Sequence, residues 1–213
     1  MWDVRSGRCL QEMTCGHNVF SVKLSVDTTL IATGDAMSKA KGWDTASGAL
    51  RQTFDCAGWV HCVYFSGDAC MLATGDQGKQ ARLWNATTGE LVYALPCESE
   101  VLQVDLSRGK RMLTLSQKNG TVAQYHCAPG RLLAAADFKG DVNWIDLSED
   151  YLVTAGPGAK VTLSRVRHDG KRCEHVRDHT MAGSCFGVDL SADGTLVAAG
   201  DVSGKARVWA TGD

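Results

Sequence analysis

The 213-residue chain lacks most of the features that mark linkers, membrane segments or polyanion-binding surfaces. It has three prolines and no low-complexity stretch, so no domain boundary is expected and residues 1–213 form a single domain. No apolar run approaches the roughly 20 residues that a membrane-spanning helix needs, so no membrane insertion is expected. The net charge is −2 and the basic residues are scattered, whereas phosphate binding needs clustered Lys and Arg. Direct nucleic-acid binding is therefore not expected either.

Targeting signals and paired cysteines are missing as well. The N-terminus has neither a secretory nor a transit pattern, which favours a cytoplasmic or nuclear location. The nine cysteines include no CxxC pair. Cys15, Cys56 and Cys97 are 41 residues apart, so they occupy one equivalent position in successive units and do not converge on a metal. We expect buried free thiols in a reducing compartment, and no cofactor.

Catalytic motifs are also absent from the chain. There is no GxSxG, no P-loop and no HExxH, so we expect no catalytic residues and no enzymatic activity. His168, Cys173, His175 and His179 lie close together in the sequence and leave one alternative open, a site for a metal or small ligand. Because neighbouring residues of a strand face opposite sides, only Cys173, His175 and His179 would share a face, and a solvated polar edge is the preferred interpretation.

What the chain does have is a regular internal repeat. A glycine in a polar turn occurs at positions 7, 48, 89, 130, 170 and 212, at steps of 41, 41, 41, 40 and 42 residues. A serine follows the same step at 25, 66, 107, 148 and 191, and a tryptophan does so at 2, 43, 84 and 209, with a tyrosine at 125. Three markers in one phase predict a repeat protein.

Each unit predicts four short strands. In the second complete unit these are residues 60–66, 71–76, 80–85 and 90–95, separated by polar turns, and helical periodicity is absent throughout. Such runs favour an antiparallel four-stranded sheet in each unit and an all-β fold. The units span about 16–56, 57–97, 98–138, 139–179 and 180–213.

The period, the four strands and a Trp-Asp pair closing the third strand together resemble the WD40-repeat family. Trp2-Asp3 and Trp43-Asp44 match this dipeptide, and Gly16-His17 stands where the family's Gly-His opens a repeat. The resemblance covers the whole chain and implies a β-propeller of four-stranded blades around a central channel. The repeat markers are Trp43, Trp84, Trp209, His17, Asp35, Asp76 and Asp201. Gly-His occurs only once, so the family's hydrogen-bond network of His, Asp, Ser or Thr, and Trp is expected to be incomplete in every unit.

The number of blades stays open at this point. Residues 8–15 resemble an outer strand, and residues 1–15 could complete the last blade by pairing beside 205–209, which would close a ring of five blades. Alternatively the chain is part of a larger propeller, since seven blades are most frequent in the family. An open arc would expose two apolar faces and is expected to close, to recruit missing blades or to aggregate.

The resemblance implies recognition at the narrow end of the channel, where each first strand begins. The candidate partner-binding residues are Asn18, Phe20, Trp59, His61, Glu100, Leu102, Asp141, Asn143 and Phe186. Trp59 is the sharpest candidate, either as an exposed interface anchor or as a residue packed on the neighbouring blade. Trp144, inside a strand, is expected in the core.

The sequence thus predicts a scaffold or adaptor without catalysis that binds protein or peptide partners within a multiprotein complex. A substrate-receptor subunit of a ubiquitin ligase and a small-ligand-binding or metal-binding propeller remain the alternatives.

Overall fold

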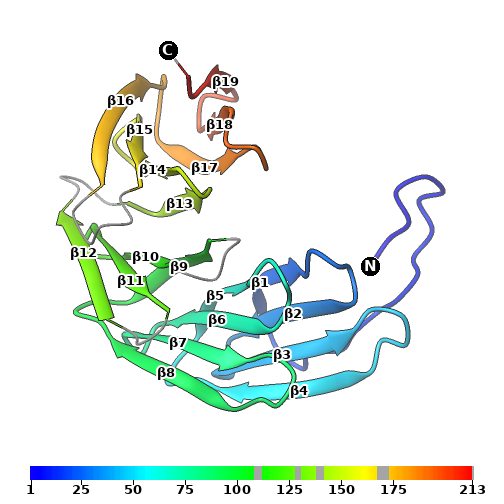
Figure 1. The fold of residues 1–213 in the computed structure, drawn as a ribbon. Coiled ribbons are helices and arrows are strands. Elements are labelled where there is room, and N and C mark those ends of the chain that lie inside the picture. Colours follow the sequence, from blue (N-terminus) through cyan, green and yellow to red (C-terminus); the bar gives the residue numbers. More distant parts are fainter. Residues whose placement is uncertain (108–111, 128–130, 138–141, 167–172, 213) are drawn as a thin grey trace.

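A computed structural model describes residues 1–107, 112–127, 131–137, 142–166 and 173–212. All regular elements in these ranges are β-strands, which form five antiparallel sheets placed side by side in an open arc (Figure 1). None of the described segments is a helix long and apolar enough to cross a membrane.

The strands follow the repeat. The first sheet holds β1 (Val19–Leu24), β2 (Leu30–Asp35), β3 (Lys39–Asp44) and β4 (Leu50–Asp55). The second holds β5 (Val60–Phe65), β6 (Met71–Asp76), β7 (Gln80–Asn85) and β8 (Leu91–Pro96). The third holds β9 (Val101–Leu106), β10 (Met112–Gln117), β11 (Thr121–His126) and β12 (Arg131–Asp137). The fourth holds β13 (Trp144–Leu147), β14 (Tyr151–Ala155), β15 (Lys160–Arg165) and β16 (Glu174–Thr180). The last has three strands, β17 (Cys185–Leu190), β18 (Leu196–Asp201) and β19 (Ala206–Ala210).

The repeated serine holds the turn between first and second strands. The Ser66 hydroxyl donates to Asp68 Oδ1 over 2.8 Å and accepts the Met71 N–H at 3.0 Å. Ser25 and Ser191 make the same pair of bonds in their own turns. This local side-chain bonding stabilises a tight turn, which explains why the serine recurs with the period.

The repeated glycine reverses the chain between third and outer strands. Gly48 and Gly89 have φ of +70° and +78°, a conformation that a Cβ disfavours, and the Gly89 N–H donates to the Asn85 carbonyl at 2.9 Å. Gly7 (φ +66°) makes the same bond to Asp3. The expectation of a hairpin turn is confirmed at these three positions, whereas Gly130 and Gly170 lie outside the described residues.

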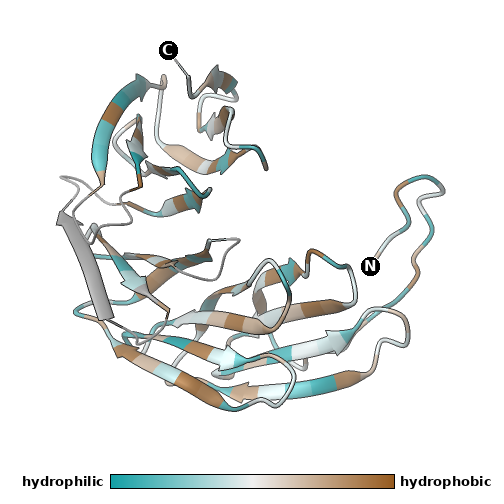
Figure 2. Ribbon diagram, in the orientation of Figure 1, coloured by the Kyte–Doolittle hydropathy of each residue, from teal (hydrophilic) through white to brown (hydrophobic). Residues whose placement is uncertain are grey.

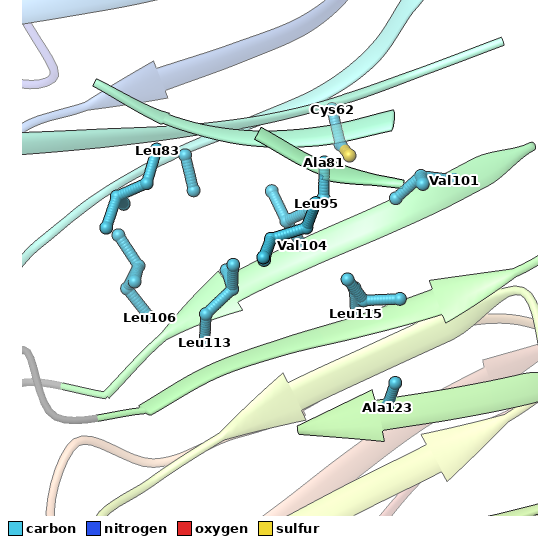
Figure 3. Close-up of a cluster of buried hydrophobic side chains, with 11 residues drawn as sticks. Cys62, Ala81, Leu83, Leu95, Val101, Val104, Leu106, Leu113, Leu115 and Ala123 are labelled. Carbon is cyan, nitrogen blue, oxygen red and sulfur yellow. The ribbon is translucent and has the colours of Figure 1, made fainter. Parts of the chain in front are cut away.

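The core lies between neighbouring sheets. Figure 3 shows β9 residues Val101, Val104 and Leu106 facing Ala81 and other small or aliphatic side chains of the second sheet. Apolar residues (brown) recur along the strands of the first two sheets in Figure 2. Each sheet therefore buries its apolar side chains mainly against its neighbours, as in other repeat proteins.

Two of the tryptophan markers are tied to the second strand. Trp84 Nε1 donates to Thr74 Oγ1 at 3.0 Å, and Trp43 makes the same bond to Thr33. Asp76, at the end of β6, pairs with Arg82 and accepts the Ala57 N–H at 3.1 Å. Asp76 thus ties the segment before β5 to the end of β6.

The first and last repeats follow the same principle with local differences. His17 is exposed, and Asp35 instead accepts the N–H groups of Met37 and Lys39. Asp201 accepts the Ala182 N–H at 2.9 Å, while Trp209 stacks on His179 with a centroid distance of 4.4 Å.

The predicted closure by residues 8–15 does not occur in the structure. These residues do not pair with β19, and the two chain ends lie apart (Figure 1). Residues 8–15 lie against the first sheet instead, where Cys15 O accepts from Lys41 Nζ at 2.6 Å and Ala46 O accepts from Gln11 Nε2 at 2.8 Å. The physical reason is that the N-terminal segment forms a hairpin of its own. The bridge between Trp2 and Cys9 repeats the pairing of Trp43 with Leu50, so it already contains a third-strand position.

Candidate functional site

A cavity of about 760 Å³ lies on the inner side of the arc. The first strand of every sheet contributes to its lining, because β1, β5, β9, β13 and β17 are neighbours in this order. The repeat places one equivalent residue of each first strand in the lining. These residues are Phe20, His61, Leu102, Asn143 and Phe186, all of them among the candidate partner-binding residues of the sequence.

An aromatic cluster stands at this cavity. The Phe20 ring lies 5.7 Å from Trp59 and 6.0 Å from His61, measured between centroids. The Trp59 side chain is 46% exposed. Trp59 thus packs on a residue of the neighbouring sheet and still offers a large aromatic surface to solvent, and its role as an interface anchor stays a prediction.

Charged side chains adjoin the aromatic cluster. His61 Nε2 lies 3.6 Å from Glu100 Oε2, and Lys118 Nζ donates to Glu100 Oε1 at 3.0 Å. The Lys118 ammonium holds the pKa of Glu100 below its usual value. Lys118 lines the cavity but was not among the predicted residues, because it lies in the turn after β10 and matches no repeat marker.

The remaining predicted residues have different placements. Asn18 is exposed and outside the lining, where its carbonyl accepts the Ala36 N–H at 3.0 Å. Asp141 lies outside the described residues. The expectation that Trp144 belongs to the core is wrong, because it is 37% exposed and lines the cavity. Successive residues of a strand face opposite sides of the sheet. The next residue, Ile145, is the one that is fully buried between sheets.

A line of polar residues crosses the first strands deeper in the channel. It occupies the position two residues before each repeated serine and consists of Lys23, Tyr64, Asp105, Asp146 and Asp189. Asp105 Oδ2 accepts the Leu147 N–H at 2.7 Å, and Asp146 Oδ2 accepts the Leu190 N–H at 2.6 Å. These carboxylates therefore join consecutive sheets. The sequence contains the signal, because the position aligns without gaps and is polar in every repeat.

Burial and mutual repulsion set the electrostatics of this line. Burial raises the pKa of Asp105 well above its usual value, and the neighbouring Asp146 raises it further. The pKa of Asp189 is also raised, by partial desolvation of a carboxyl group that remains largely exposed and by the neighbouring Asp146. The positive charge of Lys23 acts in the opposite direction and lowers the pKa of both Asp105 and Asp189. The Lys23 ammonium lies 4.1 Å from the centre of the Tyr64 ring. Asp146 and Asp189 also line a smaller cavity of about 130 Å³ beyond the first.

The alternative metal-site residues are held by separate partners. Cys173 Sγ donates to Gln124 Oε1 at 3.0 Å, and His175 Nε2 lies 3.1 Å from Asp178 Oδ1. His168 lies outside the described residues. Within the described part of the chain, no group of three His, Cys, Asp or Glu side chains is arranged to hold a metal ion. All nine cysteines are free thiols, and burial raises the pKa of Cys56 and Cys97 to about 11.

The sheet repeat and the indole bonds described above agree with what comparison of the sequence shows. Residues 48–85 and 170–210 match the family described as WD domain, G-beta repeat. The chain contains WD40 repeats. The solved structure of U3-55K superposes with a TM-score of 0.84 at 18% identity, over 95% of this chain and 63% of that one. The WD40 repeats thus share the fold of U3-55K, and the chain spans less than two thirds of its length. A comparison with curated proteins gave no match.

Proposed function

We propose that this chain is a non-catalytic protein-interaction scaffold that binds peptide or protein partners at the inner cavity. The observation that carries the proposal is the cluster of Phe20, Trp59 and His61, a partly exposed aromatic surface beside a cavity of about 760 Å³. Aromatic side chains at the edge of a concave site are typical anchors of protein interfaces. A role within a multiprotein complex in the cytoplasm or nucleus is part of the same proposal.

The charge distribution at the cavity supports selectivity for polar partners. Glu100 and Lys118 form an ion pair beside the aromatic cluster, and Asp146 and Asp189 line the deeper part. A partner that inserts an apolar group would contact the aromatic rings, while its polar groups would meet fixed charges. Such complementarity mainly sets specificity and association rate.

The Trp59→Ala substitution tests this proposal. The chain and its variant would be immobilised, and proteins captured from a cell lysate would be quantified by mass spectrometry. We expect a set of captured proteins to fall about tenfold or more with Trp59→Ala, because a buried aromatic anchor contributes about 2 kcal/mol or more to binding. Thermal unfolding should change by no more than a few degrees, since Trp59 is half-exposed in the free chain.

Trp2→Ala is the matched control. Trp2 is also exposed but lies in the N-terminal hairpin and not in the cavity lining, so its removal should leave the same captured set unchanged. Equal capture by the Trp59→Ala variant and the unmodified chain would remove the aromatic cluster from the binding site. Equal loss in both variants would indicate nonspecific adhesion to exposed tryptophan.

A further inference from the structure

A polar constriction lies where the inner cavity meets the smaller cavity of about 130 Å³. Tyr64, Asp146 and Asp189 line both cavities, so they stand at the junction between them. Along β1, Phe20 lines the first cavity, whereas Val26, six residues later in the chain, lines the second. The constriction therefore places carboxyl groups at the end of the inner cavity that is remote from the aromatic cluster.

The carboxyl groups at the constriction lack hydrogen-bond donors. Asp105 is 1% exposed and stands behind Asp146, with the two carboxyl groups within hydrogen-bonding reach of each other. Asp105 Oδ2 accepts the Leu147 N–H at 2.7 Å, but the buried Oδ1 accepts no hydrogen bond from any residue that the structure describes. Adjacent carboxylates repel each other, and a buried acceptor without a donor is costly. A positive charge next to Asp146 would relieve both costs.

The chain itself supplies little positive charge at this place. The position two residues before each repeated serine faces the constriction and carries Lys23, Tyr64, Asp105, Asp146 and Asp189, one residue from each first strand. The Lys23 ammonium lies over the Tyr64 ring at 4.1 Å and acts on Asp105 and Asp189 through its charge. One cation thus faces three carboxyl groups. Tyr64, Asp105 and Asp146 belong to sheets that have a neighbouring sheet on either side.

The walls of the inner cavity suit a long side chain that ends in a charge. Trp144 and Phe186 line the cavity and are 37% and 65% exposed. Trp144 precedes Asp146 by two positions in β13, so both side chains stand on the same side of that strand. Aromatic rings pack against methylene groups and also attract a cation over their faces. The cavity thus combines an apolar wall with an acidic end.

We infer that the partner inserts an arginine side chain into the inner cavity. Its guanidinium lies at Asp146 and Asp189, and its methylene groups pack against the rings of Trp144 and Phe186. The inference rests on the proposed function, because it names the chemistry of a group that the same cavity receives. A guanidinium suits the constriction better than an ammonium, because its planar fork of N–H donors can meet carboxylates from two sheets at once. Its charge also offsets the repulsion at the buried Asp105.

Selection of random peptides from a displayed library on the immobilised chain tests the inference. We expect the enriched peptides to share an arginine. A synthetic copy with citrulline at that position should bind about tenfold or more weakly, since citrulline keeps the shape of arginine and loses the charged hydrogen bonds. A copy with lysine should bind less tightly than the arginine peptide, because an ammonium lacks the fork.

Two variants of the chain place the arginine. Asp146→Asn keeps an oxygen for the Leu190 N–H, and it should weaken binding of the arginine peptide by a similar factor while leaving the citrulline peptide unchanged. Asp189→Asn should have a smaller effect, and it tests the same charge at a largely exposed position. Glu12→Gln, exposed in the N-terminal segment, is the matched control and should bind like the unmodified chain.

The outcomes separate the inference from the proposed function. Enriched peptides without a basic residue, equal binding of the arginine and citrulline peptides, or lysine bound as tightly as arginine would each overturn the inference. An equal loss with Glu12→Gln and Asp146→Asn would do the same, since it would indicate a general effect of net charge. The proposed function would still stand in these cases if Trp59→Ala weakens capture of the enriched peptides. A library without any enriched peptide would overturn both.

Discussion

The interior interfaces and the two ends of the arc use equivalent apolar positions of the repeat, and the main difference between them is the presence of a neighbouring sheet. Val63 is buried by the first sheet, whereas its counterpart Val22 is two thirds exposed because no sheet precedes it. Leu83 and Val208 show the same contrast on the other side. A sheet of this kind therefore does not bury its own apolar residues, and stability arises from nearest-neighbour contacts along the array.

The polar tethers show the same dependence on a neighbour. Gln103 Oε1 and Asp105 Oδ2 of β9 accept the N–H groups of Ile145 and Leu147 in β13. Asp189 occupies the equivalent position in β17, the first strand of the last sheet. Among the described residues no sheet follows this one, so Asp189 joins no further strand and is exposed. A buried carboxylate in the interior and an exposed one at the end thus come from one repeated position.

The largest expected effect comes from truncating an interior aromatic residue. Phe65→Ala should destabilise the chain by about 3–5 kcal/mol, because Phe65 is 4% exposed and packs between the first and second sheets. Leu24→Ala, at the equivalent position of β1, should cost about 1 kcal/mol or less. Urea unfolding measures both. Similar losses in the two variants would mean that the β1 face is covered in solution.

A smaller effect is expected from adding one methyl group. Gly75→Ala should cost about 1–3 kcal/mol, since its Cβ would lie 2.5 Å from Val101 Cγ1 and 2.7 Å from Cys62 Sγ. Gly200→Ala should be neutral or stabilise by up to about 1 kcal/mol, because the added methyl meets open space and the unfolded chain loses freedom. Thermal unfolding of both variants provides the measurement. A loss at Gly200 equal to that at Gly75 would contradict the open end face.

The smallest expected effect is the pH dependence of the buried carboxylate. Because the pKa of Asp105 is raised in the folded state, this group contributes stability below about pH 3.8, and the contribution is lost as pH rises through the folded-state pKa. Asp105→Asn keeps an oxygen for the Leu147 N–H and removes the charge. Its melting temperature relative to the unmodified chain should therefore rise between pH 4 and pH 8. Asp189→Asn should show the same trend more weakly, since Asp189 is exposed, and a difference independent of pH would refute the explanation.

Much of the fold was predictable because its markers are local. The Ser66 hydroxyl bonds residues within five positions, and Gly89 closes a turn with Asn85, so both act wherever the repeat places them. The cavity lining at Phe20, His61 and Asn143 was also predictable, since it follows from strand position within the repeat.

The exposure of Trp144 was not predictable, because strand alternation alone does not say which face of the strand meets the cavity. Lys118 was missed because its role depends on Glu100, 18 residues away.

The sequence by itself determined the strand order within each sheet, the turns and the equivalent positions along the repeat, because these depend on hydrogen bonds between residues close in the chain. The tertiary structure decided what the equivalent positions became. Burial at Val63 and exposure at Val22, close contact at Gly75 and open space at Gly200, and the failure of residues 8–15 to join β19 all follow from which sheets stand next to one another. Side chains that meet across two sheets lie about 42 positions apart in the chain, as Gln103 and Ile145 do, so no single repeat encodes that outcome.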